Sequence, residues 1–213
     1  MALHEGRRFD PTLYLVTDPV LAGPRGVVET VRQALDGGVT LVQLRDPEAK
    51  TRALCETAAA LLEVTRPRGI PLVINDRVDV MLAVGADGVH VGARDMAPGL
   101  VRRLTGPDAI VGLSITTLEE LAAADLGPVD YIGASPVHAT PTKTDTGPAL
   151  GLDGLARLRA ATDLPIVAIG GLHAGNVRAA VEAGADGIAV VSAIMAAADP
   201  AAAALVLRGA TGL

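Results

Sequence analysis

The chain alternates eight times between a short apolar run rich in β-branched residues and a longer segment with the apolar spacing of an amphipathic helix. The runs cover residues 12–18, 39–44, 69–75, 87–92, 108–114, 128–134, 163–171 and 186–192. They are continuously hydrophobic, as strands are when helices cover both faces of a parallel sheet. Eight strand–helix units predict an α/β fold, a single (β/α)8 TIM barrel.

An open, doubly wound sheet is the alternative architecture for repeated strand–helix units. The first run, "TLYLVTD", is not followed by the G-x-G-x-x-G pattern of such sheets, and the count of units reaches eight. No linker or shift in composition divides the chain. We therefore expect residues 1–213 to form one barrel domain with its active site at the C-terminal ends of the strands.

The amino-acid composition limits the kinds of molecule that the protein is expected to bind. The net charge is −6, and the chain has two tyrosines, one phenylalanine and no tryptophan, so it offers neither a basic stripe nor stacking aromatics for nucleic acid. No apolar run reaches the length of a membrane-spanning helix, and the N-terminus does not read as a secretory signal. Cys55 is the single cysteine, which favours a reducing, cytoplasmic location. Small-molecule substrates are therefore expected.

Polar residues collect where the runs end, which is where barrels of this class build their sites. Asp76 and Asp95 close the third and fourth runs, and two carboxylates at one mouth suit Mg²⁺ together with substrate phosphate oxygens. Each aspartate has an alternative role as the cap of the following helix, and Ser114 has the same alternative. His90, between two valines, is predicted to be a hydrogen-bonded barrel histidine rather than a metal ligand.

A phosphate site is expected across the barrel, after the seventh and eighth runs. Gly170 and Gly171 permit close approach of backbone N–H groups to an anion, and Ser192 begins a small-residue helix. A simple tight turn is the alternative for the two glycines. A metal-bound diphosphate at one side and a plain phosphate at the other indicate a group-transfer enzyme with two phosphorylated substrates.

Six motifs at the strand ends, with "YLVTD" and "VVSAI" at either end of the match, resemble the thiamine-phosphate synthase family. They are "QLRD" (43–46), "INDRVDV" (74–80), "GVHVGARD" (88–95), "GLS" (112–114), "TPTK" (140–143) and "AIGGL" (168–172). The resemblance implies a Mg²⁺-dependent transferase that joins an aminopyrimidine diphosphate to a thiazole phosphate. It implies release of pyrophosphate and formation of thiamine phosphate.

The resemblance also implies a role for each matching residue. Asp76 and Asp95 would hold Mg²⁺, and Arg45, Ser114 and Lys143 would be catalytic. The substrate-binding set would be Gln43, Arg45, Asn75, Ser114, Thr140, Thr142, Lys143, Gly171, Val191 and Ser192. The polar segment 135–151 would be a lid that excludes water from a reactive pyrimidine cation.

The sequence departs from the family pattern at three positions. Pro47 stands where the family usually has a lysine in Q-x-R-x-K, Thr116 replaces a frequent histidine, and His138 replaces a frequent aromatic residue. Pro47 removes a diphosphate contact, and Lys50 lies three residues on. Three alternatives therefore stay open: a thiazole tautomerase, a sugar-phosphate isomerase or aldolase, and a non-catalytic barrel that binds thiazole phosphate.

Overall fold

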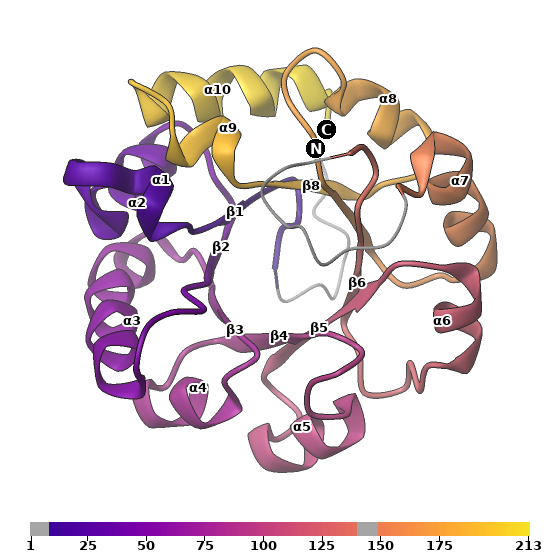
Figure 1. Cartoon of the computed structure of the whole chain (residues 1–213), viewed down its shortest axis with the longest axis horizontal. Coiled ribbons are helices and arrows are strands. Elements are labelled where there is room, and N and C mark those ends of the chain that lie inside the picture. The colour runs from indigo at the N-terminus through magenta and orange to yellow at the C-terminus, as the bar shows by residue number, and fades with distance from the viewer. Residues whose placement is uncertain (1–8, 140–148) are drawn as a thin grey trace.

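Eight parallel strands close into a barrel in the order β1 to β8, as the sequence predicts (Figure 1). The computed structural model describes residues 9–139 and 149–213. The strands are β1 (Leu13–Val16), β2 (Leu41–Leu44), β3 (Leu72–Asn75), β4 (Gly88–Val91), β5 (Ile110–Ile115), β6 (Tyr131–Ala134), β7 (Ile166–Ile169) and β8 (Gly187–Val190). All eight lie within the predicted runs except that β5 extends one residue further. The barrel closes where Tyr14 of β1 pairs with Ala189 of β8.

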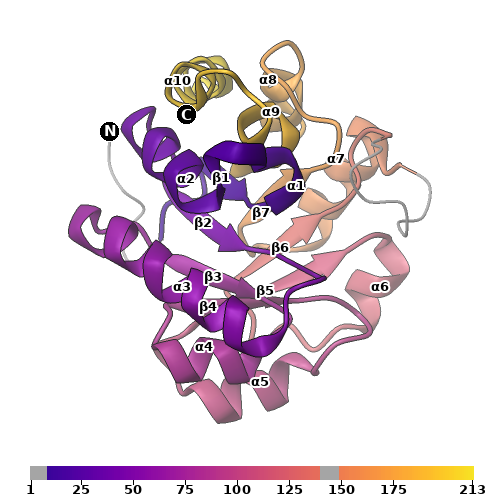
Figure 2. The same ribbon diagram turned by 60° about the vertical axis from the view of Figure 1, so that its left-hand side comes forward.

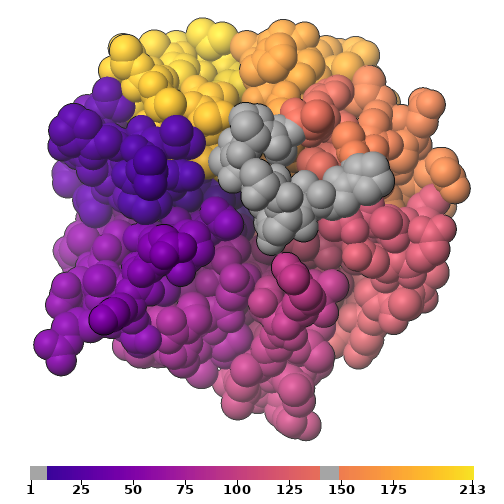
Figure 3. Space-filling model, in the orientation of Figure 1, coloured from indigo at the N-terminus to yellow at the C-terminus, as the bar shows by residue number. Residues whose placement is uncertain are grey.

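Helices surround the barrel as an outer layer (Figure 2). They are α1 (Pro19–Ala22), α2 (Val27–Asp36), α3 (Thr51–Thr65), α4 (Val78–Val84), α5 (Pro98–Thr105), α6 (Leu118–Ala123), α7 (Gly151–Ala161), α8 (Val177–Glu182), α9 (Ser192–Met195) and α10 (Pro200–Thr211). Two short 3-10 turns, η1 (Gly23–Arg25) and η2 (Arg66–Arg68), follow α1 and α3. Figure 3 shows the colours running once around the molecule, so that the N-terminal and C-terminal parts of the chain lie side by side, and α2 contacts α10 there. In the described ranges, no helix has the length and hydrophobicity needed to cross a bilayer.

The strands contribute side chains to two separate apolar cores. Leu13 and Leu15 point outward into the large core between strands and helices, whereas Tyr14 and Val16 point into the barrel lumen. This alternation follows from the two-residue period of a strand. Because both faces are buried, each run is hydrophobic throughout, which explains the pattern seen in the sequence.

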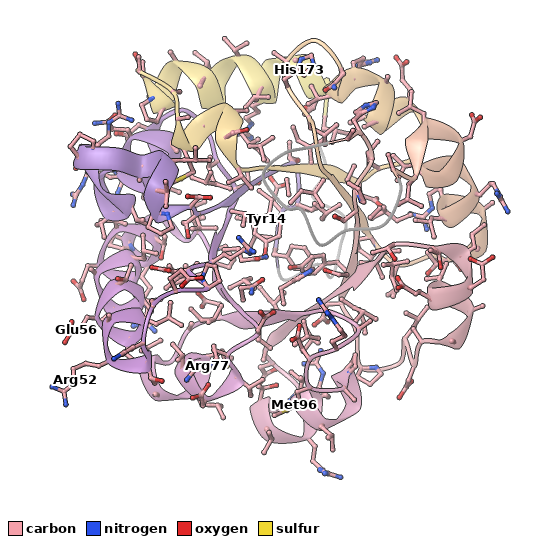
Figure 4. The ribbon with its side chains drawn as sticks, in the orientation of Figure 1. Tyr14, Arg52, Glu56, Arg77, Met96 and His173 are labelled. Carbon is pink, nitrogen blue, oxygen red and sulfur yellow. The ribbon has the colours of Figure 1, made fainter. Side chains whose placement is uncertain are left out.

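The lumen is narrow, and small residues make room in it for large ones. Tyr131 is fully buried there, and a side chain at Gly112 would clash with both its ring and the ring of His90. All three Phe and Tyr residues of the chain therefore lie in the lumen, where Phe9, Tyr14 and Tyr131 form one cluster. Figure 4 shows Tyr14 within the ring of strands, while Arg52 and Glu56 lie outside it.

The sequence "GADG" occurs twice, at residues 85–88 and 184–187, and it has a structural role at the opposite, N-terminal end of the strands. Asp87 accepts a hydrogen bond from the backbone N–H of Leu72 at 2.8 Å, and Asp186 accepts one from Ile166 at 2.9 Å. Each aspartate thus ties its own strand to the preceding one. The motif recurs because two strand pairs are fixed in the same way.

Candidate active site

A cavity opens at the carboxyl ends of the strands. Its wall includes Gln43 of β2 and Arg45 just after it, Asn75 at the end of β3, Ser114 of β5 and Val191 after β8. All five are among the residues that the sequence marked as substrate-binding. Gln43 and Arg45 share this wall, as expected for residues two apart. The other lining residues are Tyr14, Val16, His90, Tyr131, Gly133, Ser135, Val167, Ile169, Gly170 and Ala189.

A continuous series of hydrogen bonds crosses the floor of this cavity. Gln43 donates from Nε2 to the Tyr14 hydroxyl at 2.8 Å, and the Tyr14 and Tyr131 hydroxyls lie 2.9 Å apart. The Tyr131 hydroxyl lies 2.9 Å from His90 Nδ1, and His90 Nε2 lies 2.9 Å from Ser114 Oγ. We call these five side chains the polar chain. His90 is a hydrogen-bonded barrel histidine, as the sequence predicts.

Burial keeps the two phenols of the polar chain protonated. Both hydroxyls lie in the lumen, where loss of solvation raises the pKa of Tyr14 and of Tyr131 far above the usual range of tyrosine. Each tyrosine therefore retains one proton to donate at neutral pH. The polar chain therefore carries no tyrosinate charge, and it acts on the site through hydrogen bonds.

Thr17 fixes the backbone of Arg45. The Thr17 hydroxyl accepts from the Arg45 N–H at 2.9 Å and donates to the Arg45 carbonyl oxygen at 3.1 Å. The residue is almost fully buried, with 1% of its surface exposed. One side chain thus satisfies both backbone groups of Arg45 just after β2 and sets the direction in which the guanidinium side chain leaves the strand.

The two aspartates lie at the rim rather than in the wall of the cavity. Asp76 and Asp95 are exposed, and they follow the neighbouring strands β3 and β4. Asp76 has φ +60°, the one positive φ outside glycine in the described residues. An aspartate tolerates this left-handed conformation better than most residues, though it is sparsely populated, and such outliers cluster at functional sites.

Neither aspartate is the cap of the next helix. Arg77 occupies the N-cap of α4 and Ala97 that of α5, and neither makes a side-chain capping bond. Asp95 instead accepts from the Gly92 N–H at 2.7 Å within its own loop. Ser114 is not a cap either, since the N-cap of α6 is Thr117, whose side chain accepts from the Glu120 N–H. The capping alternatives are therefore wrong.

Gly170 and Gly171 both adopt positive φ, at 103° and 64°. A Cβ at Gly171 would fall 2.8 Å from the His138 Cβ, and one at Gly170 would fall 2.7 Å from the Pro136 Cβ. The segment after β6 thus packs directly on these glycines, and the His138 N–H donates to the Gly170 carbonyl oxygen at 3.1 Å. The glycines are required for this close packing, a constraint that neither the phosphate site nor the tight turn considered for the sequence includes.

The loop after β6 leaves and returns at one place. The Leu150 N–H donates to the Pro136 carbonyl oxygen at 2.8 Å, and the Gly151 N–H donates to that of Val137 at 3.0 Å. Both ends of the segment therefore stand beside the end of β7. Thr140, Thr142 and Lys143, which the sequence assigns to substrate binding, lie outside the described residues. Ser192 begins α9 and is exposed beside the lining residue Val191.

Sequence reasoning missed the tyrosines of the site. In the sequence, Tyr14 and Tyr131 bear only on the scarcity of aromatic residues for nucleic-acid binding, and Ser135 only begins the polar segment 135–151. A signal was present, because each tyrosine places a hydroxyl in an otherwise apolar strand, and a buried hydroxyl needs a partner. The partners come from strands far apart in the sequence, so only the closed barrel reveals them.

Comparison with known proteins gives one consistent family. The family model described as "Thiamine monophosphate synthase" matches residues 13–194. Thiamine-phosphate synthase of Azorhizobium caulinodans is 59% identical over 200 residues, which cover 94% of each chain. The enzyme of the same name from Xanthobacter autotrophicus is 55% identical over 202 residues, covering 95% of this chain and 96% of that protein.

Solved structures agree with these relatives. The thiamine phosphate pyrophosphorylase of Pyrococcus furiosus has a TM-score of 0.86 and 39% identity, and the match covers 96% of this chain and 97% of that one. A 3-hexulose-6-phosphate synthase has a TM-score of 0.69 at 21% identity, covering 93% and 99% of the two chains. The second likeness concerns the fold alone.

Proposed function

The chain belongs to the thiamine-phosphate synthase family, and from this premise we propose that its cavity joins an aminopyrimidine diphosphate to a thiazole phosphate. The protein is a transferase of thiamine biosynthesis that acts on small molecules. One observation carries the site proposal. Gln43, Arg45, Asn75 and Ser114, from three different strands, line one cavity at the carboxyl ends of the barrel. The single cysteine supports a cytoplasmic location as part of the proposal.

The pyrimidine substrate is assigned to this cavity. Gln43 and Ser114 lie at the two ends of the polar chain and offer hydrogen-bonding groups to the ring. Arg45 and Asn75 stand nearer the mouth, after β2 and at the end of β3, where they reach the diphosphate. An arginine suits this role because its planar fork pairs with phosphate oxygens through two hydrogen bonds.

Asp76 and Asp95 fit a bound Mg²⁺. No cluster of three or more acidic, histidine or cysteine side chains suitable for a metal occurs in residues 9–139 and 149–213. Mg²⁺ needs only one or two carboxylates, because water and substrate phosphate oxygens complete its shell. Two exposed carboxylates at adjacent strand ends, one held in a left-handed conformation, match that requirement. When bound, the metal neutralises charge on the departing diphosphate.

The thiazole phosphate is assigned to the other side of the mouth. Gly171, Val191 and Ser192 follow β7 and β8, where barrels of this class commonly bind a phosphate through backbone N–H groups. Thr140, Thr142 and Lys143 belong to the loop whose two ends stand beside β7. That position supports a role for the loop in covering both substrates.

The chemistry requires no base and no covalent nucleophile. The bond from the pyrimidine methylene carbon to the diphosphate oxygen breaks, and its electron pair leaves with pyrophosphate. The thiazole nitrogen then donates its lone pair to the methylene carbon and forms the new C–N bond. Arg45 and Lys143 stabilise the growing charge on the leaving group, while Ser114 orients the ring. The loop after β6 must exclude water, which would otherwise capture the pyrimidine cation.

Mixing the purified protein with both substrates and Mg²⁺ tests this function. Thiamine phosphate and pyrophosphate in equal amounts are expected, and mass spectrometry identifies the first. A tautomerase, an aldolase or a binding barrel would leave the pyrimidine diphosphate unchanged. The family relatives and Asp76 disfavour these alternatives, because the tautomerases tend to lack the first metal aspartate.

The two hydrogen bonds between the Thr17 hydroxyl and the backbone of Arg45, here called the clamp, give a further prediction. Thr17→Val removes both hydrogen bonds at nearly constant volume, so the Arg45 backbone loses its constraint. We expect KM for the pyrimidine diphosphate to rise roughly three- to ten-fold, because a loosened Arg45 makes a weaker charge-assisted contact. KM for the thiazole phosphate should stay within about twofold. Steady-state kinetics with each substrate varied in turn measures the difference.

Thr40 provides a matched control. Its buried hydroxyl accepts from the Leu13 N–H at 3.0 Å and donates to the Leu13 carbonyl oxygen at 3.1 Å, across the same strand pair but at the opposite end of the barrel. Thr40→Val therefore loses the same two bonds far from the cavity. Equal changes in KM for Thr17→Val and Thr40→Val would mean that the clamp affects stability alone.

A further inference from the structure

The polar chain has two possible directions, and only one of them uses the protons of both tyrosine hydroxyls within it. Tyr14 accepts from Gln43 Nε2, so its own proton is available to its other partner, the Tyr131 hydroxyl. If Tyr14 gives that proton to Tyr131, the single proton of Tyr131 is directed toward His90 Nδ1. Both phenols keep these protons at neutral pH because they are buried. The three internal bonds thus run from β2 across the lumen toward β5.

The same arrangement determines the tautomer of a neutral His90. Nδ1 accepts in this arrangement, so the ring proton lies on Nε2 and is donated to Ser114 Oγ. The Ser114 hydroxyl has then accepted one bond and turns its own proton elsewhere. Gln43 uses Nε2 internally, which leaves its carbonyl oxygen Oε1 as the acceptor at the other end. The two ends of the polar chain therefore have opposite polarity.

Both ends stand in the wall of one cavity, and the members between them are rigidly held. Gln43 and Ser114 line the cavity, while Tyr14 and Tyr131 have 2% and 0% of their surface exposed. The rings of His90 and Tyr131 occupy the space that a Cβ at Gly112 would need, and the His90 ring also lies close to Gly133. A ligand cannot reverse one end without reversing every bond between the two.

We propose that the polar chain sets the hydrogen-bond polarity of the cavity and selects an aminopyrimidine over its oxo counterpart. Gln43 Oε1 accepts from the exocyclic amino group, and the Ser114 hydroxyl donates to a ring nitrogen. Replacing the amino group with an oxo group would put an acceptor against the Gln43 carbonyl oxygen. Tyr14, Tyr131 and His90 are positioning residues in this arrangement. The inference rests on the proposed function, because it takes the pyrimidine to be the ligand of this cavity.

The first test needs no ligand. The chain has four histidines, so ¹⁵N NMR of labelled protein resolves them, and an H90Q variant assigns the His90 signals. We expect the Nε2–H tautomer in the wild type at neutral pH. Tyr131→Phe removes the donor to Nδ1 and should raise the population of the Nδ1–H form. A wild-type His90 that carries its proton on Nδ1, or on both nitrogens, would overturn the proposal.

The second test measures selectivity. Calorimetry without thiazole phosphate compares the binding of 4-amino-2-methyl-5-hydroxymethylpyrimidine diphosphate with that of its 4-oxo counterpart, in Mg²⁺. We expect the wild type to prefer the amino compound by roughly a hundred-fold, since a mispaired buried polar group is strongly rejected. Tyr131→Phe and Tyr14→Phe should each reduce that preference by roughly tenfold. An undiminished preference in both variants would contradict the proposal.

Phe9 supplies the control for packing. Its ring centroid lies 5.3 Å from that of Tyr131 in the same lumen cluster, and it has no group that joins the polar chain. Phe9→Leu should keep the amino preference within about twofold, because it changes packing but no hydrogen bond. A wild type that binds neither pyrimidine would refute the proposed function, whereas the tautomer measurement would still decide the direction of the polar chain.

Discussion

Asp76→Asn and Asp95→Asn should each lower turnover by roughly a hundred-fold or more, and excess chelator should do the same to the wild type. Each substitution replaces a carboxylate with a neutral amide of equal size at the proposed Mg²⁺ site. The charge on the departing diphosphate is then less well neutralised, and the metal requirement rises. Steady-state rates measured over a range of Mg²⁺ concentrations give both effects.

The backbone of Asp76 decides which variants are informative. At φ +60°, alanine would add conformational strain to the loss of charge, whereas asparagine tolerates the left-handed region and glycine adopts it freely. Asp76→Gly is therefore expected to unfold at the same or a higher temperature than the wild type while losing turnover. Such a result would separate the function of the side chain from stability.

Asp79 provides the matched control for charge. It lies three residues from Asp76 at the start of α4, is exposed, and pairs with Arg77 at 2.6 Å. Asp79→Asn makes the same change in net charge and should leave turnover within about twofold, because exposed ion pairs contribute little. If the wild-type protein keeps its full turnover in excess chelator, the reaction does not depend on a metal, and Asp76 has no role as a metal ligand.

Lys143→Ala should lower kcat by roughly a hundred-fold with a smaller change in KM for the pyrimidine diphosphate. Pyrophosphate gains charge as it leaves, so an ammonium group that pairs with it acts more strongly in the transition state than in the ground state. Pro47 sharpens this expectation. With no lysine at position 47, this chain has fewer cationic side chains than the family pattern to stabilise the charge on the leaving pyrophosphate. Kinetics with varied pyrimidine diphosphate separates kcat from KM.

Lys50 is the control for Lys143, as the other of the two lysines in the chain. It is exposed at the N-cap of α3, so Lys50→Ala should change kcat and the KM for the pyrimidine diphosphate very little. A collapse of pyrimidine-diphosphate binding in Lys50→Ala would show that Lys50 replaces the missing lysine. Pro47→Lys should instead tighten that binding by roughly tenfold, the value of one charge-assisted contact. Wild-type kcat in Lys143→Ala would exclude the loop from the electrostatics of the reaction.

The fold was predictable from the sequence because local signals and long-range packing agree. Runs such as 12–18 and 186–192 are apolar on both faces, which a parallel barrel requires, and β1 and β8 form within them. The regular strand–helix alternation then leaves few topologies. The "GADG" repeat was visible as a helix-to-strand connection. Its aspartate bonds were not, since their partners lie on the preceding strand.

The candidate site was predictable only in part. Strand-end position was sufficient for Gln43, Arg45 and Asn75, because the fold brings those ends together. It failed to show that Asp76 and Asp95 lie at the rim, which depends on loop geometry after the strand. The role of Tyr14 and Tyr131 in the site could not be predicted, because the hydrogen-bond partners of their hydroxyls lie on other strands across the lumen. Such contacts depend on closure, which no local pattern encodes.

The most direct test of the central claim is the product itself. The wild-type protein, with Mg²⁺ and both phosphorylated substrates, is incubated beside Asp95→Asn and Asp79→Asn, and each mixture is analysed by mass spectrometry and pyrophosphate assay. The account predicts thiamine phosphate and an equal amount of pyrophosphate from the wild type and Asp79→Asn, and little of either from Asp95→Asn. Unchanged substrates in the wild-type mixture, or pyrophosphate released without thiamine phosphate, would contradict it.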